Sequence, residues 1–156
     1  MKFRGNYSYS IDSKGRVMLP NEIRSVMTER SIDRFVVLPG FSVDYKYLFI
    51  LPKDFSNTIE SKLESLKFFD VKAQQIFTFF FGNSFEVQAD GQGRIRIPSG
   101  LVAKFGFAKE VVITGEGDFL KLWIPEDYKQ MMEKEFTGDM ENITDILNSI
   151  NEKYDI

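Results

Sequence analysis

The sequence predicts a mixed α/β fold made of two similar halves that together form a pseudo-twofold unit. Three observations carry this prediction. Blocks of the first half recur in the same order in the second half, alternating apolar residues flank a tight-turn motif in each copy, and prolines stand in front of stretches with helical spacing. Repetition of this kind indicates one structural unit used twice.

The repeat consists of three blocks in matching order. Residues 9–20 lie over 87–98, residues 35–40 lie over 110–115, and residues 51–55 lie over 124–128. The offset between the copies falls from 78 to 75 to 73 residues, so the first copy carries the longer connections.

Each first block holds the motif Asp-x-x-Gly-Arg-x-x-x-Pro, which begins at Asp12 and again at Asp90. Alternating apolar residues precede the motif (Tyr7, Tyr9 and Ile11; Phe85 and Val87) and follow it (Val17 and Leu19; Ile95 and Ile97). This pattern predicts a β-hairpin in each half, with the glycine at a positive φ. The aspartate is expected to accept backbone N–H groups of the turn.

Helices and a second strand pair follow each turn. We expect short helices at about 20–27, with Ile23, Val26 and Met27 on one face, and from Pro98 to a cap at Gly106. The strand pairs are expected at 35–39 with 47–51 and at 110–114 with 119–124. Pro52 and Pro125 then open longer amphipathic helices.

Two segments lie outside the repeat. Residues 71–81 contain the run Ile76-Phe-Thr-Phe-Phe-Phe81 and are predicted to form a helix buried between the halves. The alternative is a flat hydrophobic interface for a neighbouring subunit. Beyond Thr137 the chain is acidic, and Ile143, Ile146, Leu147 and Ile150 have the spacing of a helix that either docks or stays free.

Composition excludes several classes of function. The 156 residues include 23 aromatic side chains but no Cys and no His, which rules out thiolate nucleophiles, Cys/His zinc sites and Ser-His-Asp triads. The glycines at 91–93 and 115–117 lack a following Gly-Lys-Ser/Thr, and Glu116 and Asp118 lie at an expected turn. We therefore expect no enzyme, no catalytic residue, no metal and no cofactor. Without a membrane-length apolar run or a signal peptide, we expect a cytoplasmic protein with no membrane contact.

Charge is distributed unevenly along the chain. The net charge is −3, yet residues 1–34 hold seven basic and four acidic residues, whereas residues 126–156 hold three basic and nine acidic ones. One end can therefore face a polyanion. The first turn is the best candidate, because Arg16 can fork to a guanine edge and Lys14 can reach a phosphate. The alternative is that the arginine only pairs locally with Asp12.

The chain resembles the MraZ family of bacterial transcriptional regulators over about residues 2–136. The resemblance rests on Phe3-Arg4-Gly5, both Asp-x-x-Gly-Arg-x-x-x-Pro blocks, Phe79-Phe80-Phe81, and Gly115-x-Gly117-Asp118 leading to Leu122-Trp123. It implies two AbrB-like swapped-hairpin repeats, a double-ψ-like β-barrel with helices packed outside. It also implies a ring-shaped homo-oligomer, associated with the nucleoid, that binds direct repeats in double-stranded promoter DNA of the division and cell-wall gene cluster.

The same resemblance assigns DNA contacts and segments. Arg16 and Lys14 match the DNA-contacting turn together with Gly15 and Asp12. Arg4 and Arg94 are weaker candidates, and for Arg94 the reason is that Gln92 replaces the lysine in the second turn. The expected segments are a first repeat with its following helix (1–69), a connecting helix (70–83), a second repeat with its helix (84–136) and an acidic tail (137–156). The alternative function is an antitoxin-like or other protein-interaction module without promoter binding.

Overall fold

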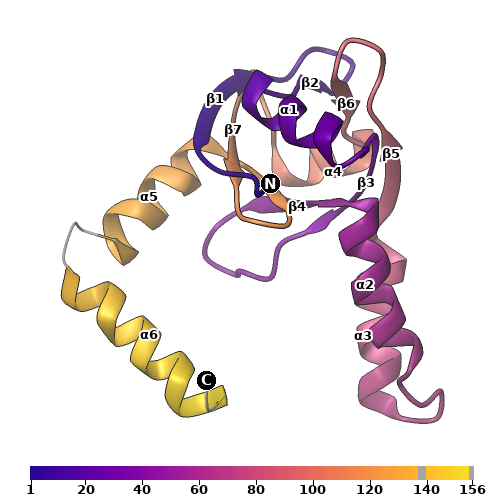
Figure 1. Ribbon diagram of the computed structural model, residues 1–156, viewed down its shortest axis with the longest axis vertical. Coiled ribbons are helices and arrows are strands. Elements are labelled where there is room, and N and C mark those ends of the chain that lie inside the picture. Colours follow the sequence, from indigo (N-terminus) through magenta and orange to yellow (C-terminus); the bar gives the residue numbers. More distant parts are fainter. Residues whose placement is uncertain (137–139, 155–156) are drawn as a thin grey trace.

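An open, antiparallel six-stranded sheet forms the centre of the molecule (Figure 1). The computed structural model describes residues 1–136 and 140–154. The strand order is β1-β7-β8-β4-β3-β5, so β1 and β5 are the edges and the sheet does not close into a barrel in the described part of the chain. The strands are β1 (Asn6–Ser10), β3 (Arg34–Pro39), β4 (Tyr47–Pro52), β5 (Phe85–Gln88), β7 (Glu110–Gly115) and β8 (Leu120–Trp123).

A separate two-stranded ribbon corrects the expected hairpins. Strands β2 (Arg16–Met18) and β6 (Arg94–Arg96) pair antiparallel with each other, while β1 pairs with β7 and β5 with β3. Around the first turn the hairpin is reduced to one isolated bridge, between Ile11 and Val17. The prediction of a local hairpin was therefore wrong for strand pairing. The pairing of β2 with β6 buries Val17 and Ile95, which face each other in the ribbon with no exposed surface. Burial of these side chains therefore decides the strand pairing over closeness in sequence.

The helices begin where the prolines predicted. The short helices are α1 (Asn21–Glu29) and α4 (Ser99–Phe105), and the longer ones are α2 (Lys53–Glu64) and α5 (Pro125–Glu135). The predicted face of α1, with Ile23, Val26 and Met27, is buried. Gly106 ends α4 in the left-handed conformation, as expected, with φ 70°.

The two faces of the sheet carry two cores. Alternate residues of β4 show the division: Leu48 and Ile50 face the core under the ribbon, α1 and α4, whereas Phe49 and Leu51 face the core under α2, α3 and α5. The molecule therefore has three layers, with the sheet in the middle and helices outside. This arrangement confirms the mixed α/β class.

Helix α3 (Val71–Asn83) does not lie buried between the halves. It runs beside α2 as an arm that projects from the body (Figure 1), and only Ala73 and Phe80 are buried. Ile76 and Phe81 are each 43% exposed. The expected burial was wrong because most of the helix extends past the sheet and has only α2 to pack against.

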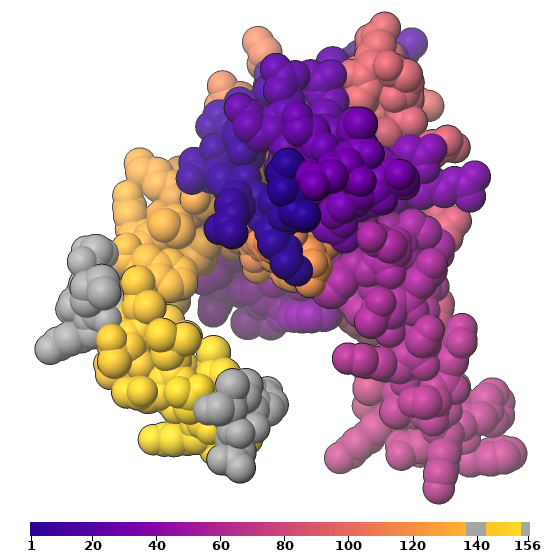
Figure 2. All heavy atoms as spheres, viewed as in Figure 1, coloured from indigo at the N-terminus to yellow at the C-terminus, as the bar shows by residue number. Residues whose placement is uncertain are grey.

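The acidic tail forms the predicted helix. Helix α6 (Met140–Tyr154) follows α5 and stands apart from the α2–α3 arm, as Figure 2 shows. Its apolar stripe of Ile143, Ile146, Leu147 and Ile150 is exposed. No helix in the described residues is both long and apolar enough to cross a membrane.

Candidate nucleic-acid interface

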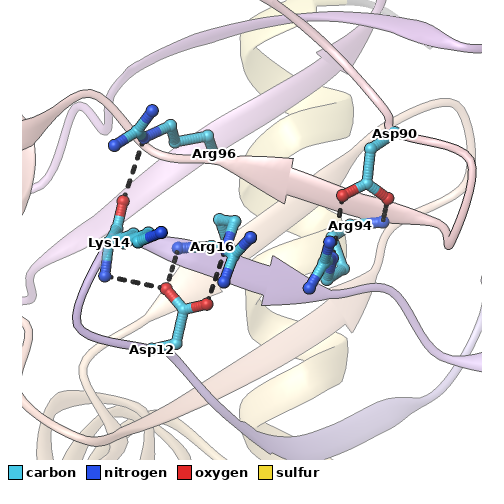
Figure 3. A network of polar contacts seen from close by, with 6 residues as sticks. All are labelled: Asp12, Lys14, Arg16, Asp90, Arg94 and Arg96. Carbon is cyan, nitrogen blue, oxygen red and sulfur yellow. Dashed lines mark hydrogen bonds and ion pairs between the residues drawn. The ribbon is translucent and has the colours of Figure 1, made fainter.

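The two turn motifs have the same hydrogen-bond geometry (Figure 3). In the first turn, Asp12 Oδ1 accepts the backbone N–H groups of Lys14 at 2.9 Å and Arg16 at 2.8 Å, and Oδ2 accepts from Arg16 Nε at 2.7 Å. In the second turn, Asp90 accepts the corresponding bonds from Gln92 and Arg94 at 2.9, 3.0 and 2.8 Å. The predicted role of the aspartates in closing the turns is confirmed.

Both turns also require their glycines. Gly15 and Gly93 have φ values of 79° and 80°, as predicted. A Cβ on Gly15 would lie 2.9 Å from the backbone oxygen of Ile97, so the turn packs directly against the end of β6. In the native structure Ile97 N–H donates to the Gly15 oxygen at 2.8 Å, and Leu19 N–H donates to the Gly93 oxygen at 3.0 Å. Each turn is thus held by the strand that continues from the other turn.

The turn carboxylates are held in their charged form. Backbone hydrogen bonding from Arg16 is the main cause that lowers the pKa of Asp12, and Arg94 does the same for Asp90. Local pairing of arginine with aspartate, left open by the sequence, is therefore present in both turns. It occupies Nε of each arginine, and among the described residues no hydrogen bond engages the terminal guanidinium nitrogens of Arg16 or Arg94.

The outer face of the ribbon collects arginines from both halves. Because side chains alternate along a strand, burial of Val17 and Ile95 turns the neighbouring Arg16, Arg94 and Arg96 outward. Arg16 lies directly opposite Arg96, and Arg94 lies opposite Met18. Arg96 Nε donates to the backbone oxygen of Lys14 at 3.0 Å, which links the first turn to the second half (Figure 3).

Sequence reasoning missed Arg96. Its signal was the spacing Arg94-Ile95-Arg96, which puts two arginines on one face of a strand. The proximity of Arg96 to Lys14, 82 positions earlier, depends on the exchange of strands and has no local signature.

Arg4 is not brought to the ribbon. It precedes β1, whereas Asp12 and the turn follow the other end of this strand. Eight residues of extended chain separate the two, which is roughly 25 Å. The backbone of Arg4 instead packs against Gly115, the last residue of β7, next to the connection between β7 and β8.

The acidic residues at that connection have structural partners. Glu116 pairs with Lys121 at 3.1 Å, and Asp118 pairs with Lys2 at 2.5 Å. The described residues include no group of three or more carboxylates, Cys or His that could hold a metal ion.

The chain is similar to known proteins along nearly its whole length. A family model described as "MraZ protein, putative antitoxin-like" matches residues 80–146. The "Transcriptional regulator MraZ" of Desulforamulus reducens is 34% identical over 148 residues, covering 93% of this chain and 99% of that protein. The protein of the same name from Nitrosospira multiformis is 35% identical over 131 residues, covering 84% and 87%. A solution structure of PHS018 from Pyrococcus horikoshii covers 76% of this chain and 96% of that chain, with 11% identity and a TM-score of 0.36.

Proposed function

The chain belongs to the MraZ family, a family of transcriptional regulators rather than enzymes, and from this premise we propose that it binds promoter DNA in a sequence-specific manner. The proposed target is direct repeats in its own promoter, within the division and cell-wall gene cluster. The proposed place of action is the nucleoid in the cytoplasm. The proposed contacts are Arg16 and Lys14, with Asp12 and Gly15 holding the turn and Arg94 making a weaker contact.

One observation carries the proposal: an isolated two-stranded antiparallel ribbon that bears arginines on its outer face. The major groove of B-DNA admits a two-stranded ribbon, and an arginine fork matches the O6 and N7 acceptors of guanine. Asp12 fixes Arg16 through Nε alone, so the two terminal nitrogens remain for such a fork. Fixing the side chain before binding also lowers the conformational entropy lost on DNA.

We also propose the AbrB-like swapped-hairpin architecture for the two halves, with the repeats at 1–69 and 84–136 joined by residues 70–83. The pairing of β2 with β6 supports it, since the strand after each turn leaves its own half. The sheet adds a second exchange, because β1 lies beside β7 and β5 beside β3.

A ring-shaped homo-oligomer is part of the same proposal. An apolar cavity of about 790 Å³ opens between α2, α3 and the sheet, lined by Phe41, Phe49, Phe55, Ile59, Ile76 and Phe79, among other residues. Exposed apolar surface of this kind is typical of a protein–protein contact. Several turns in one assembly would raise the effective concentration at successive DNA repeats, which compensates for the few contacts of a single turn.

The test is titration of DNA from upstream of the protein's own gene, over a series of salt concentrations. Binding through phosphates requires affinity to fall with salt, with a log–log slope of about −0.9 for each phosphate neutralised. A salt-independent interaction, or equal affinity for scrambled DNA, would refute the proposal. Light scattering at micromolar concentration tests the oligomer, and a monomer that still binds tightly would refute that part.

The second candidate is an antitoxin-like protein-interaction module without promoter binding. It is favoured by helix α6, where an exposed apolar stripe lies within an acidic tail. Removal of residues 137–156 separates the two candidates, because DNA binding by the ribbon does not need the tail. Loss of promoter binding on truncation would count against the ribbon.

A further inference from the structure

We propose that Arg96 completes, with Lys14, a site for one DNA backbone phosphate at the first end of the ribbon, beside the base-reading Arg16. The inference rests on the proposed DNA binding and adds to it a residue from the second half. It also assigns this residue a chemistry different from base reading, namely the neutralisation of a full negative charge.

The first argument is an electrostatic conflict in the ribbon. Arg16 and Arg96 are directly opposite each other in antiparallel register. Like charges at directly opposed positions of a strand pair are destabilising. Asp12 compensates Arg16 through an ion pair, whereas Arg96 is exposed and has no ion pair with any described residue. The arrangement therefore leaves one guanidinium whose charge the protein does not balance.

The second argument is the contrast between the two ends of the ribbon. The first end holds three cations, Lys14, Arg16 and Arg96, against the single carboxylate of Asp12, which leaves a net charge of +2. The motif at the second end supplies one cation, Arg94, against the carboxylate of Asp90, which leaves a net charge of zero.

The neighbours of the second end do not change this contrast. The hollow beside the second turn includes Arg24, Asp33 and Asp90 as its charged residues, which leaves a net charge of −1. The hollow beside the first turn includes Lys14, Arg96 and Asp12 as its charged residues, so its net charge is positive. An anion is therefore favoured at the first end alone.

The third argument identifies the anion as a phosphate rather than a base edge. The acceptors of a base carry partial charges, whereas the repulsion between two guanidinium groups and a lysine is offset best by a full negative charge. The bond from Arg96 Nε to the Lys14 carbonyl keeps the arginine beside the first turn (Figure 3). Phosphate contacts fix the position of a protein on DNA, so this site would set the register in which Arg16 meets a base.

The experiment replaces Arg96 by the residue at the equivalent position of the first copy, Met18. Affinity of the full-length parent and of Arg96→Met is measured at 50 and 200 mM salt, on upstream DNA and on scrambled DNA of equal length. We expect the variant to lose affinity for both DNAs by the same factor. Its salt slope should be smaller by about 0.9 per engaged site, so that over this range it loses about 3.5-fold less affinity than the parent.

Two further variants make the result specific. Arg96→Lys should keep most of the affinity, because lysine binds phosphate as a point charge but cannot supply the fork that a guanine edge needs. Lys67→Met removes one charge in the connection between α2 and α3, at the far end of the arm from the ribbon (Figure 1), and should leave affinity unchanged. Melting of Arg96→Met should match or exceed that of the parent, since the opposed charges are relieved.

Each contrary outcome overturns a defined claim. A loss confined to upstream DNA with an unchanged salt slope would make Arg96 a base-reading residue, and unchanged affinity would remove it from the interface. Equal losses of affinity in Arg96→Met and Lys67→Met would show that the effect comes from the net charge of the protein alone. All three refute the phosphate site while leaving promoter binding intact, whereas a parent that binds no DNA refutes both.

Discussion

Replacing Arg16 and Arg94 by alanine, each in turn, separates recognition from structure. The two arginines close equivalent turns with the same bonds: Nε lies 2.7 Å from Asp12 in one and 2.8 Å from Asp90 in the other. Their side chains are 33% and 27% exposed. The second arginine is therefore a matched control for the first.

The expected cost in stability is small and equal. Substitution of a partly exposed surface side chain changes the free energy of unfolding by about 0.5 to 1 kcal/mol, which lowers the melting temperature of a chain of this size by roughly 1–4 °C. Because the geometry of the turns matches, the two variants should melt within about 2 °C of each other.

The expected cost in DNA affinity is unequal. Loss of a guanine fork costs about 1–3 kcal/mol, or roughly 5- to 150-fold, for each engaged turn. This loss should follow Arg16→Ala, since Arg16 lies at the end of the ribbon with the excess positive charge. Arg94→Ala should cost less than about 5-fold, because Gln92 replaces the lysine there and the charges balance.

Thermal melting and fluorescence-anisotropy titration of upstream DNA measure both quantities. The recognition role fails if Arg16→Ala binds as tightly as the parent, or if the two variants lose affinity equally. A drop in melting temperature of more than about 10 °C for Arg16→Ala would instead make the arginine a structural residue.

Three further outcomes follow from local geometry. Gly15→Ala should lower the free energy of unfolding by about 2 kcal/mol or more, and Gly106→Ala by about 1 kcal/mol, as measured by urea unfolding. Both glycines have positive φ, but only a Cβ on Gly15 would press on a backbone oxygen. Phe80→Ala should cost about 3–5 kcal/mol and the exposed Phe81→Ala under about 1.5 kcal/mol, and equal losses on melting would contradict the one-sided packing of α3. Because the pKa of Asp12 is lowered in the fold, its ionised carboxylate stabilises the folded chain above pH 3.8, the ordinary value, and this contribution is lost as pH falls through the folded pKa. The difference in unfolding free energy between the parent and Asp12→Asn should therefore narrow below pH 3.8, as acid unfolding would measure.

Local chemistry made the turns and helix starts predictable. In each turn the aspartate bonds to backbone groups no more than four residues further along the chain, from Asp12 to Arg16 and from Asp90 to Arg94. The proline at the start of α1, α2, α4 and α5 acts through its own fixed φ. Such features depend on a few consecutive residues, so the sequence could specify them without knowledge of the rest of the fold.

Burial of α3 and the position of Arg4 could not be predicted in this way. The aromatic run of α3 has the composition of a core helix, but burial depends on whether a second surface reaches it, and along the arm only α2 does. Arg4 lies in a basic segment of the sequence, yet strand β1 carries it away from the turn. In both cases the deciding distance is one that only the folded chain defines.

The two turns, their charges and the duplication that relates them can all be read from consecutive residues. The tertiary structure alone decided that the strand after each turn pairs with its counterpart in the other half, which sets Arg16 opposite Arg96. The physical reason is that the local hairpin and the exchanged ribbon use the same alternating pattern and the same turns. What distinguishes them is the burial of Val17 against Ile95, a contact across 78 residues that becomes available only when both halves share one core.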